Sequence, residues 1–101
     1  MTEWSIGTGD GPGERALVSQ RQYDWGMTTP VEGIVETVAE ATGRPFDTLP
    51  PLEHVIDTGA VTALLAAAGR RGPADGVEIS FRYEGFLVTA YSTGRVTLYS
   101  D

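Results

Sequence analysis

The last quarter of the chain carries the pattern that most restricts its fold. Apolar and polar residues alternate over 77–83, which is typical of a strand with one buried face. A Glu-Gly pair follows at 84–85, where glycine supplies the positive φ that a tight hairpin needs. Two further strand-like segments, 86–91 and 95–100, flank a Ser-Thr-Gly turn at 92–94. The pattern therefore predicts three consecutive antiparallel strands.

A helix with clear start and stop signals is expected upstream of these strands. Thr29 is a natural N-cap and Pro30 a natural first helical residue. Gly43 ends the helix, and Pro45 prevents it from resuming. One face of this helix collects apolar side chains, and we expect that face to be buried: Val31, Ile34, Val35, Val38 and Ala39.

A second, more apolar helix is expected to begin at Asp57 or Thr58 and to stop at Gly69. Its expected buried stripe consists of Val61, Leu64, Leu65 and Ala68. Between the two helices lies a short connection, 46–57. A proline pair at 50–51 excludes a regular helix there.

The beginning of the chain has weaker signals. Residues 1–14 hold four glycines among polar residues, which predicts a flexible arm. Residues 15–23 are a candidate for a first strand, although their alternation is imperfect. The expected fold is α+β, in the order β-α-α-β-β-β, with two helices packed on one face of an antiparallel sheet. Residues 15–101 form one domain in this interpretation.

The charge balance points to a salty environment. The chain has 14 acidic and 7 basic residues, all seven of them arginine, and a net charge of −7. At about 1 M ionic strength the Debye length is ~3 Å, so an acidic surface repels itself little. We interpret the chain as adapted to a salt-rich cytoplasm; the alternative is an ordinary acidic domain. Glu32, Glu36 and Glu40 repeat at helical spacing and are interpreted as a solvated face.

Several classes of location and chemistry are not expected. There is no cysteine, which excludes disulfides and thiolate metal sites. The first residues lack a basic start and an apolar run, so no signal peptide is expected. The longest mostly apolar stretch, 61–68, is too short to span a bilayer. We therefore expect a cytoplasmic protein with no membrane partner.

No catalytic, cofactor or metal site is expected either. The glycine run at 7–13 has no strand before it, no helix after it and no lysine, so it is not a phosphate loop. His54 is the only histidine, and its nearby acidic neighbours are Glu53 and Asp57, the latter better explained as a helix cap. We expect neither an enzyme nor a small-molecule substrate.

Three segments in this order, 30–43, 49–57 and 60–65, resemble the halobacterial output domain family of the first type. The most specific of the matching features is Leu-Pro-Pro-Leu at 49–52. The likeness extends through the hairpin and the last strand and covers residues 20–100. His54 departs from it, because an acidic or polar residue is usual there, and so does the Thr-Gly pair at 58–59.

The resemblance implies an output-like domain of haloarchaeal signalling proteins. We therefore expect a non-enzymatic module that acts through a protein partner, such as a signalling component, and a homodimer stays open. The expected contact residues lie on the stiff connection between the helices: Pro51, Leu52, Glu53, His54 and Val55. The alternative is a DNA-binding or transcription-associated regulator. Its basic residues would be Arg70, Arg71, Arg82 and Arg95, which is a weak basic grouping for nucleic acid.

Overall fold

The computed structural model describes residues 4–7, 16–69 and 76–100. In chain order its elements are β1 (Trp4–Gly7), β2 (Leu17–Gln22), α1 (Pro30–Thr42), α2 (Thr58–Gly69), β3 (Glu78–Tyr83), β4 (Phe86–Tyr91) and β5 (Arg95–Ser100). Two short 3₁₀ turns, Phe46–Thr48 and Leu52–His54, lie in the connection between the helices.

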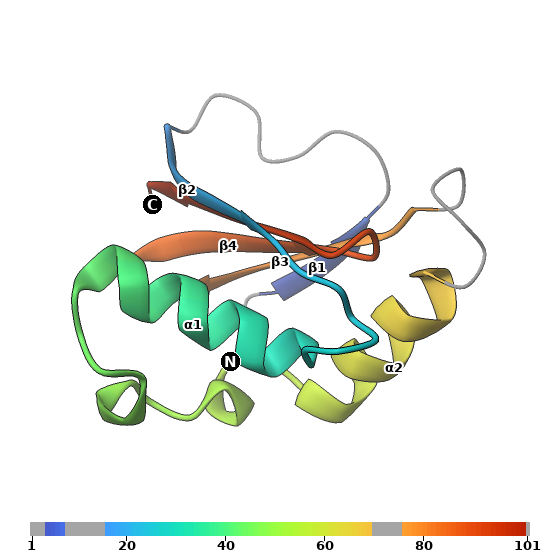
Figure 1. Ribbon diagram of the computed structural model, residues 1–101, viewed down its shortest axis with the longest axis horizontal. Coiled ribbons are helices and arrows are strands. Elements are labelled where there is room, and N and C mark those ends of the chain that lie inside the picture. Colours follow the sequence, from blue (N-terminus) through green and yellow to red (C-terminus); the bar gives the residue numbers. More distant parts are fainter. Residues whose placement is uncertain (1–3, 8–15, 70–75, 101) are drawn as a thin grey trace.

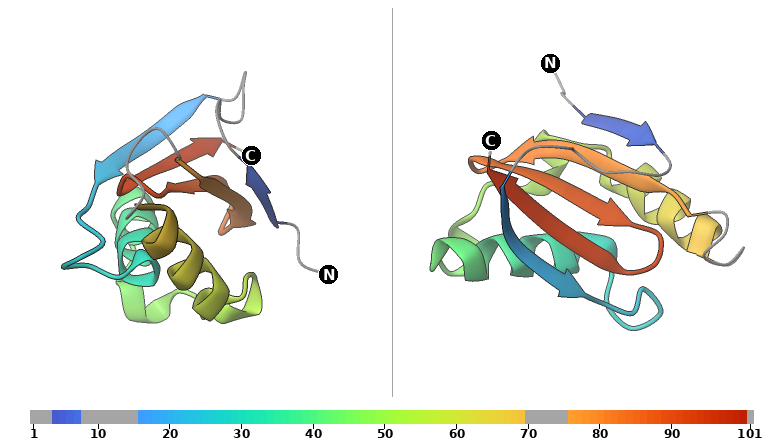
Figure 2. Two further views of the ribbon diagram at one scale, coloured as in Figure 1. Left: turned by 90° about the vertical axis from the view of Figure 1, so that its right-hand side faces the viewer. Right: turned by 90° about the horizontal axis from the view of Figure 1, so that it is seen from above.

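The described strands form one antiparallel sheet in the order β1-β3-β4-β5-β2. Both helices lie on the same side of this sheet in Figures 1 and 2. The α+β class and the antiparallel meander β3-β4-β5 are confirmed. The element order differs from the expected one because a strand precedes the candidate first strand.

That additional strand is β1, in a segment that the sequence assigned to a flexible arm. It pairs with β3, so that Trp4 lies opposite Phe81 and Gly7 opposite Glu78. The arm prediction is therefore wrong for these four residues. The reason is that the open edge of β3 offers backbone donors and acceptors to any extended segment, whatever its glycine content. The rest of the predicted arm lies outside the described residues.

The ends of α1 are as predicted, but its buried face is rotated. The Thr29 hydroxyl accepts a hydrogen bond from the Glu32 amide at 3.2 Å, and Gly43 has a left-handed φ of 70°. The buried residues of the helix are Pro30, Gly33, Ile34, Thr37 and Val38. Val31, Val35 and Ala39, which the sequence placed on the buried face, are only half-buried.

Two aromatic side chains after β2 explain this rotation. Tyr23 and Trp25 stack with ring centroids 5.7 Å apart and rest against the glycine of α1. A Cβ at Gly33 would lie 2.9 Å from the Trp25 ring, so only glycine allows this approach. The Tyr23 hydroxyl is 3.0 Å from that of Thr37, which also satisfies a buried polar group.

The core lies between the helices and one face of the sheet. Ile34 and Val38 of α1 and Val61 and Leu65 of α2 are at most 1% exposed. They belong to one cluster with buried strand residues: Ile79, Phe81, Tyr83, Val88, Ala90, Val96 and Leu98. Asp57 caps α2 by accepting from the Ala60 amide at 3.0 Å, one of the two starts that the sequence allowed.

The β3–β4 turn has the predicted two residues. Glu84 and Gly85 have φ values of 51° and 85°. Two consecutive positive φ values are the geometry that matches the twist of a tight hairpin. Tyr83 and Phe86 pair across it, which fixes the register of β3 against β4.

Candidate protein-interaction surface

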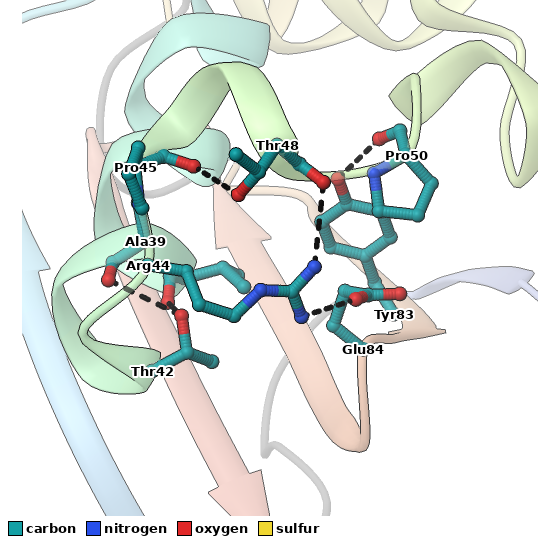
Figure 3. Close-up of polar contacts among 9 residues, drawn as sticks. Ala39, Thr42, Arg44, Pro45, Thr48, Pro50, Tyr83 and Glu84 are labelled. Atoms are coloured by element: carbon teal, nitrogen blue, oxygen red, sulfur yellow. Dashed lines mark hydrogen bonds and ion pairs between the residues drawn. The ribbon is translucent and has the colours of Figure 1, made fainter.

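The connection between α1 and α2 is fastened to the β3–β4 turn by polar contacts (Figure 3). The Arg44 guanidinium lies 2.8 Å from a carboxylate oxygen of Glu84 and also donates to the Thr48 carbonyl at 3.4 Å. The Tyr83 hydroxyl donates to the Pro50 carbonyl. Burial raises the pKa of Tyr83, so the hydroxyl stays a donor well above neutral pH. These contacts hold the connection in one conformation.

Local hydrogen bonds stiffen the same segment. The Pro45 carbonyl accepts from both the amide and the hydroxyl of Thr48, at 3.0 and 2.7 Å. The second 3₁₀ turn is closed by the amides of His54 and Val55. Because Pro50 and Pro51 also restrict the backbone, little conformational entropy remains to be lost on binding.

The connection has an inner and an outer side. Leu49, Leu52 and Ile56 are at most 8% exposed and belong to the core. Four of the residues between them are exposed: Pro50, Pro51, Glu53 and His54. The buried leucines and isoleucine anchor the segment, and the outer residues are left for contacts with other molecules.

A groove lies where this connection meets the outer flank of α1. Its lining consists of Val31, Glu32, Val35, Glu36 and Phe46, and its volume is about 460 Å³. Phe46 is 68% exposed, which is unusual for so large an apolar side chain. Val31 and Val35 are half-buried and form the floor. We name these five residues the Phe46 groove.

The rim of the Phe46 groove is acidic. The Glu32 amide donates to the Thr29 hydroxyl at 3.2 Å, and the Glu32 carboxylate accepts from the same hydroxyl at 2.9 Å. Glu36 is exposed one turn further along and helps to raise the pKa of Arg21, after larger contributions from Tyr23 and Glu40. The groove therefore combines an apolar floor with negative charge, which suits contact with a protein better than contact with a phosphate backbone.

A second cavity, of about 410 Å³, lies between Trp25, Leu65 and Ser92. Its polar groups already have structural roles. The Trp25 indole donates to the Tyr91 carbonyl at 2.8 Å, and the Ser92 hydroxyl accepts from the Val77 amide at 3.0 Å. This cavity lies where Tyr23 and Trp25 meet α2 and the β4–β5 turn.

The model of the family described as halobacterial output domain 1 matches residues 26–100. The chain belongs to this family. The match includes the whole Phe46 groove and the connection. It begins at residue 26, so β2 and Trp25 lie before it. The chain matches no curated protein and no solved structure closely enough to be called similar.

The five contact residues that the sequence suggested for this output domain are divided by the fold. Pro51, Glu53 and His54 are exposed and Val55 is half-buried. Leu52, by contrast, is 3% exposed and packs in the core. It is therefore wrong as a contact residue, because its side chain supplies the inward anchor of the second 3₁₀ turn.

Sequence reasoning missed Phe46, Val31 and Val35. The two valines fit a helical stripe, which predicts burial, and Phe46 after a proline looks like an ordinary plug for the core. The available signal was the glycine at 33, because a helix face that contains glycine and threonine can approach aromatic rings more closely than a face of valines. The face with Gly33 and Thr37 is therefore buried, and Val31 and Val35 lie on the flank of the helix.

The arginines give the DNA-binding alternative little support in the described part of the chain. Arg21 pairs with Glu40, Arg44 pairs with Glu84, and the Arg95 guanidinium lies 4.7 Å above the Tyr91 ring. Arg70 and Arg71 lie outside the described residues. Within residues 4–7, 16–69 and 76–100, no group of three His, Asp or Glu side chains could hold a metal ion. In the same ranges no helix is long and apolar enough to cross a membrane.

The acidic stripe of α1 leads to a prediction about salt. Glu32, Glu36 and Glu40 repel one another by a few tenths of a kcal/mol per pair in dilute buffer. The melting temperature should therefore rise between about 0.1 M and about 2 M KCl. In Glu32→Gln with Glu36→Gln, the rise should shrink by about 2–5 °C. Glutamine at position 32 can still accept from the Thr29 hydroxyl, so the two chains differ mainly in charge.

Salt also strengthens apolar burial, and that part of the rise should be common to both chains. The control is Glu53→Gln, which removes an exposed charge outside the stripe. An identical salt dependence in all three chains would show that the stripe does not cause the effect.

Proposed function

We propose that this output domain is a non-enzymatic adaptor of signal transduction in a haloarchaeal cytoplasm, and that it binds a protein partner through the Phe46 groove and the adjoining connection. The family assignment supports the output role. The observation that carries the proposal is the exposed Phe46, held on a connection that several hydrogen bonds fix in place.

Phe46 is exposed beside the apolar floor, and aromatic side chains of this kind are enriched in the centres of protein interfaces. Binding a partner here would bury Phe46 and the exposed parts of Val31 and Val35. Each Å² of apolar surface removed from water contributes about 25 cal/mol of favourable free energy. The connection is already ordered, so this gain is reduced little by lost conformational entropy.

The test is quantitative capture of binding proteins from native extract at about 2 M KCl, a salt level that screens non-specific charge contacts. Wild type is compared with Phe46→Ser and with Met27→Ser. Met27 is 87% exposed and lies outside the groove, so its replacement removes a similar apolar side chain elsewhere on the surface. Neither replacement takes away a core residue, so both variants should melt close to wild type.

We expect a protein that wild type and Met27→Ser retain equally and that Phe46→Ser retains at least about thirtyfold less, the loss typical of a central aromatic contact. Glu53→Ala with His54→Ala should also reduce the retention of the same protein, but by a smaller factor, because these two residues lie beside the groove and extend the contact surface. If Phe46→Ser and Met27→Ser retain that protein equally well, the groove is not the contact site.

A further inference from the structure

Acidic residues are distributed unevenly over the sheet. The chain has 14 of them, yet β2, β4 and β5 contain none. The charged residues of these three strands are Arg21 and Arg95 alone. In a molecule with a net charge of −7, this half of the sheet therefore adds no negative charge of its own to the repulsion between two copies, although Glu40 and Glu36 of α1 lie near Arg21.

Strand β2 forms the outer edge of this half (Figure 2, right). The Tyr23 amide donates to the Gly94 carbonyl, and Arg21 lies opposite Val96 two positions further along. Because hydrogen bonding alternates along an antiparallel strand, Gln20 and Gln22 turn their amides and carbonyls away from β5. No strand in the described part of the chain pairs with that side of β2.

The same strand exposes apolar side chains. Leu17 is 54% and Val18 is 48% exposed, which makes them two of the four large apolar residues with exposed side chains in the described ranges. A bare edge with apolar side chains and no acidic residue is a template for another strand. The bulge between Leu17 and Ser19 limits the regular stretch, so the expected contact is short.

We propose that β2 pairs antiparallel with β2 of a second copy, so that one sheet runs through both molecules, with the two-fold axis at Gln20. Gln20 then exchanges two backbone hydrogen bonds with Gln20 of the second copy, and Gln22 lies opposite Val18. The apolar side chains of Leu17 and Val18 become covered by the other strand.

Charge decides between this register and its neighbour. An axis at Arg21 would also pair outward-facing backbone groups, but it would place two arginines directly opposite each other, which is unfavourable. With the axis at Gln20, Arg21 lies opposite Ser19 of the second copy and keeps its ion pair with Glu40. The proposal is independent of the Phe46 groove, since none of the groove residues belongs to β2.

Sedimentation velocity over a range of protein concentrations tests this pairing. The expected mass rises from the 10.8 kDa of one chain toward twice that value, and it rises at lower protein concentration in about 2 M than in about 0.1 M KCl, because salt screens the repulsion between two acidic chains. Gln20→Pro removes the outward amide without touching a bond to β5, and it should weaken dimerisation at least tenfold. Gln20→Thr keeps the amide and serves as its control.

The register is tested with single cysteines, for which the chain offers a background without any. Directly opposed residues in a hydrogen-bonded pair have Cα atoms about 5.5 Å apart, within reach of a disulfide. Gln20→Cys should therefore form a covalent dimer on mild oxidation much faster than Glu53→Cys. A mass of one chain at every concentration and salt level overturns the proposal, as does equal linking of the two cysteine variants. Faster linking in Arg21→Cys overturns the register.

Discussion

Gly94→Ala should be the most damaging single substitution in the described part of the chain. Gly94 has a φ of 100°, and a Cβ there would lie 1.9 Å from the Tyr23 carbonyl oxygen. The Gly94 carbonyl also accepts from the Tyr23 amide at 2.7 Å, so the two backbones are held together. We expect a loss of about 3–5 kcal/mol in unfolding free energy, or failure to fold, because the backbone has to separate.

Gly85→Ala is the matched control for that change. Gly85 has a comparable φ of 85°, but a Cβ there meets no atom within 4 Å. Alanine at position 85 therefore has the unfavourable φ but no steric clash, and it should lower the free energy of unfolding by about 1–2 kcal/mol. Urea unfolding of the two variants measures the difference. Equal losses would mean that the contact between the β4–β5 turn and Tyr23 is not a constraint on the fold.

Leu65→Ala should give the second large effect. Leu65 is fully buried in α2, and it also borders the 410 Å³ cavity beside Trp25. Removing its side chain should lower the free energy of unfolding by about 2–5 kcal/mol, which is a large share of the total stability of a small domain. Leu64→Ala, one position earlier and only half-buried, should cost clearly less. If the two leucine variants unfold at the same urea concentration, α2 does not pack against the sheet as described.

Local signals were sufficient for the parts of the fold that depend on neighbouring residues. The caps at Thr29 and Gly43 and the turn at Gly85 follow from side-chain chemistry and backbone sterics within a few positions. The strand alternation of 77–83 likewise reflects one buried face. Each of these features needs only a short stretch of sequence, and each was predicted.

The features that sequence reasoning missed depend on contacts between distant residues. Strand β1 exists because β3 offers an open edge, and a glycine-rich segment carries no local sign of this. The buried face of α1 is set by Tyr23 and Trp25, which approach Gly33 from outside the helix. Periodicity counts apolar residues, so it favoured Val35 over Gly33 and Thr37.

The candidate surface follows from the same cause. The rotation of α1 leaves Val31 and Val35 on its flank, and Phe46 lies beside them on the connection. The stiffness of the proline-containing connection was predicted, and the polar contacts of Arg44 and Tyr83 show how it is held. Leu52 was misassigned because a short 3₁₀ turn has an inner side that composition does not reveal.

Hydrogen exchange of the domain alone and with its captured partner tests the central claim most directly. If the Phe46 groove and the connection form the contact surface, exchange should slow at the amides of residues 46–49 and 52–54 and along α1, at about 2 M KCl, where non-specific charge contacts are screened. The amides of β4 and β5 should exchange at the same rate in both samples. Slower exchange confined to the sheet, with residues 46–49 and 52–54 unchanged, would contradict the account.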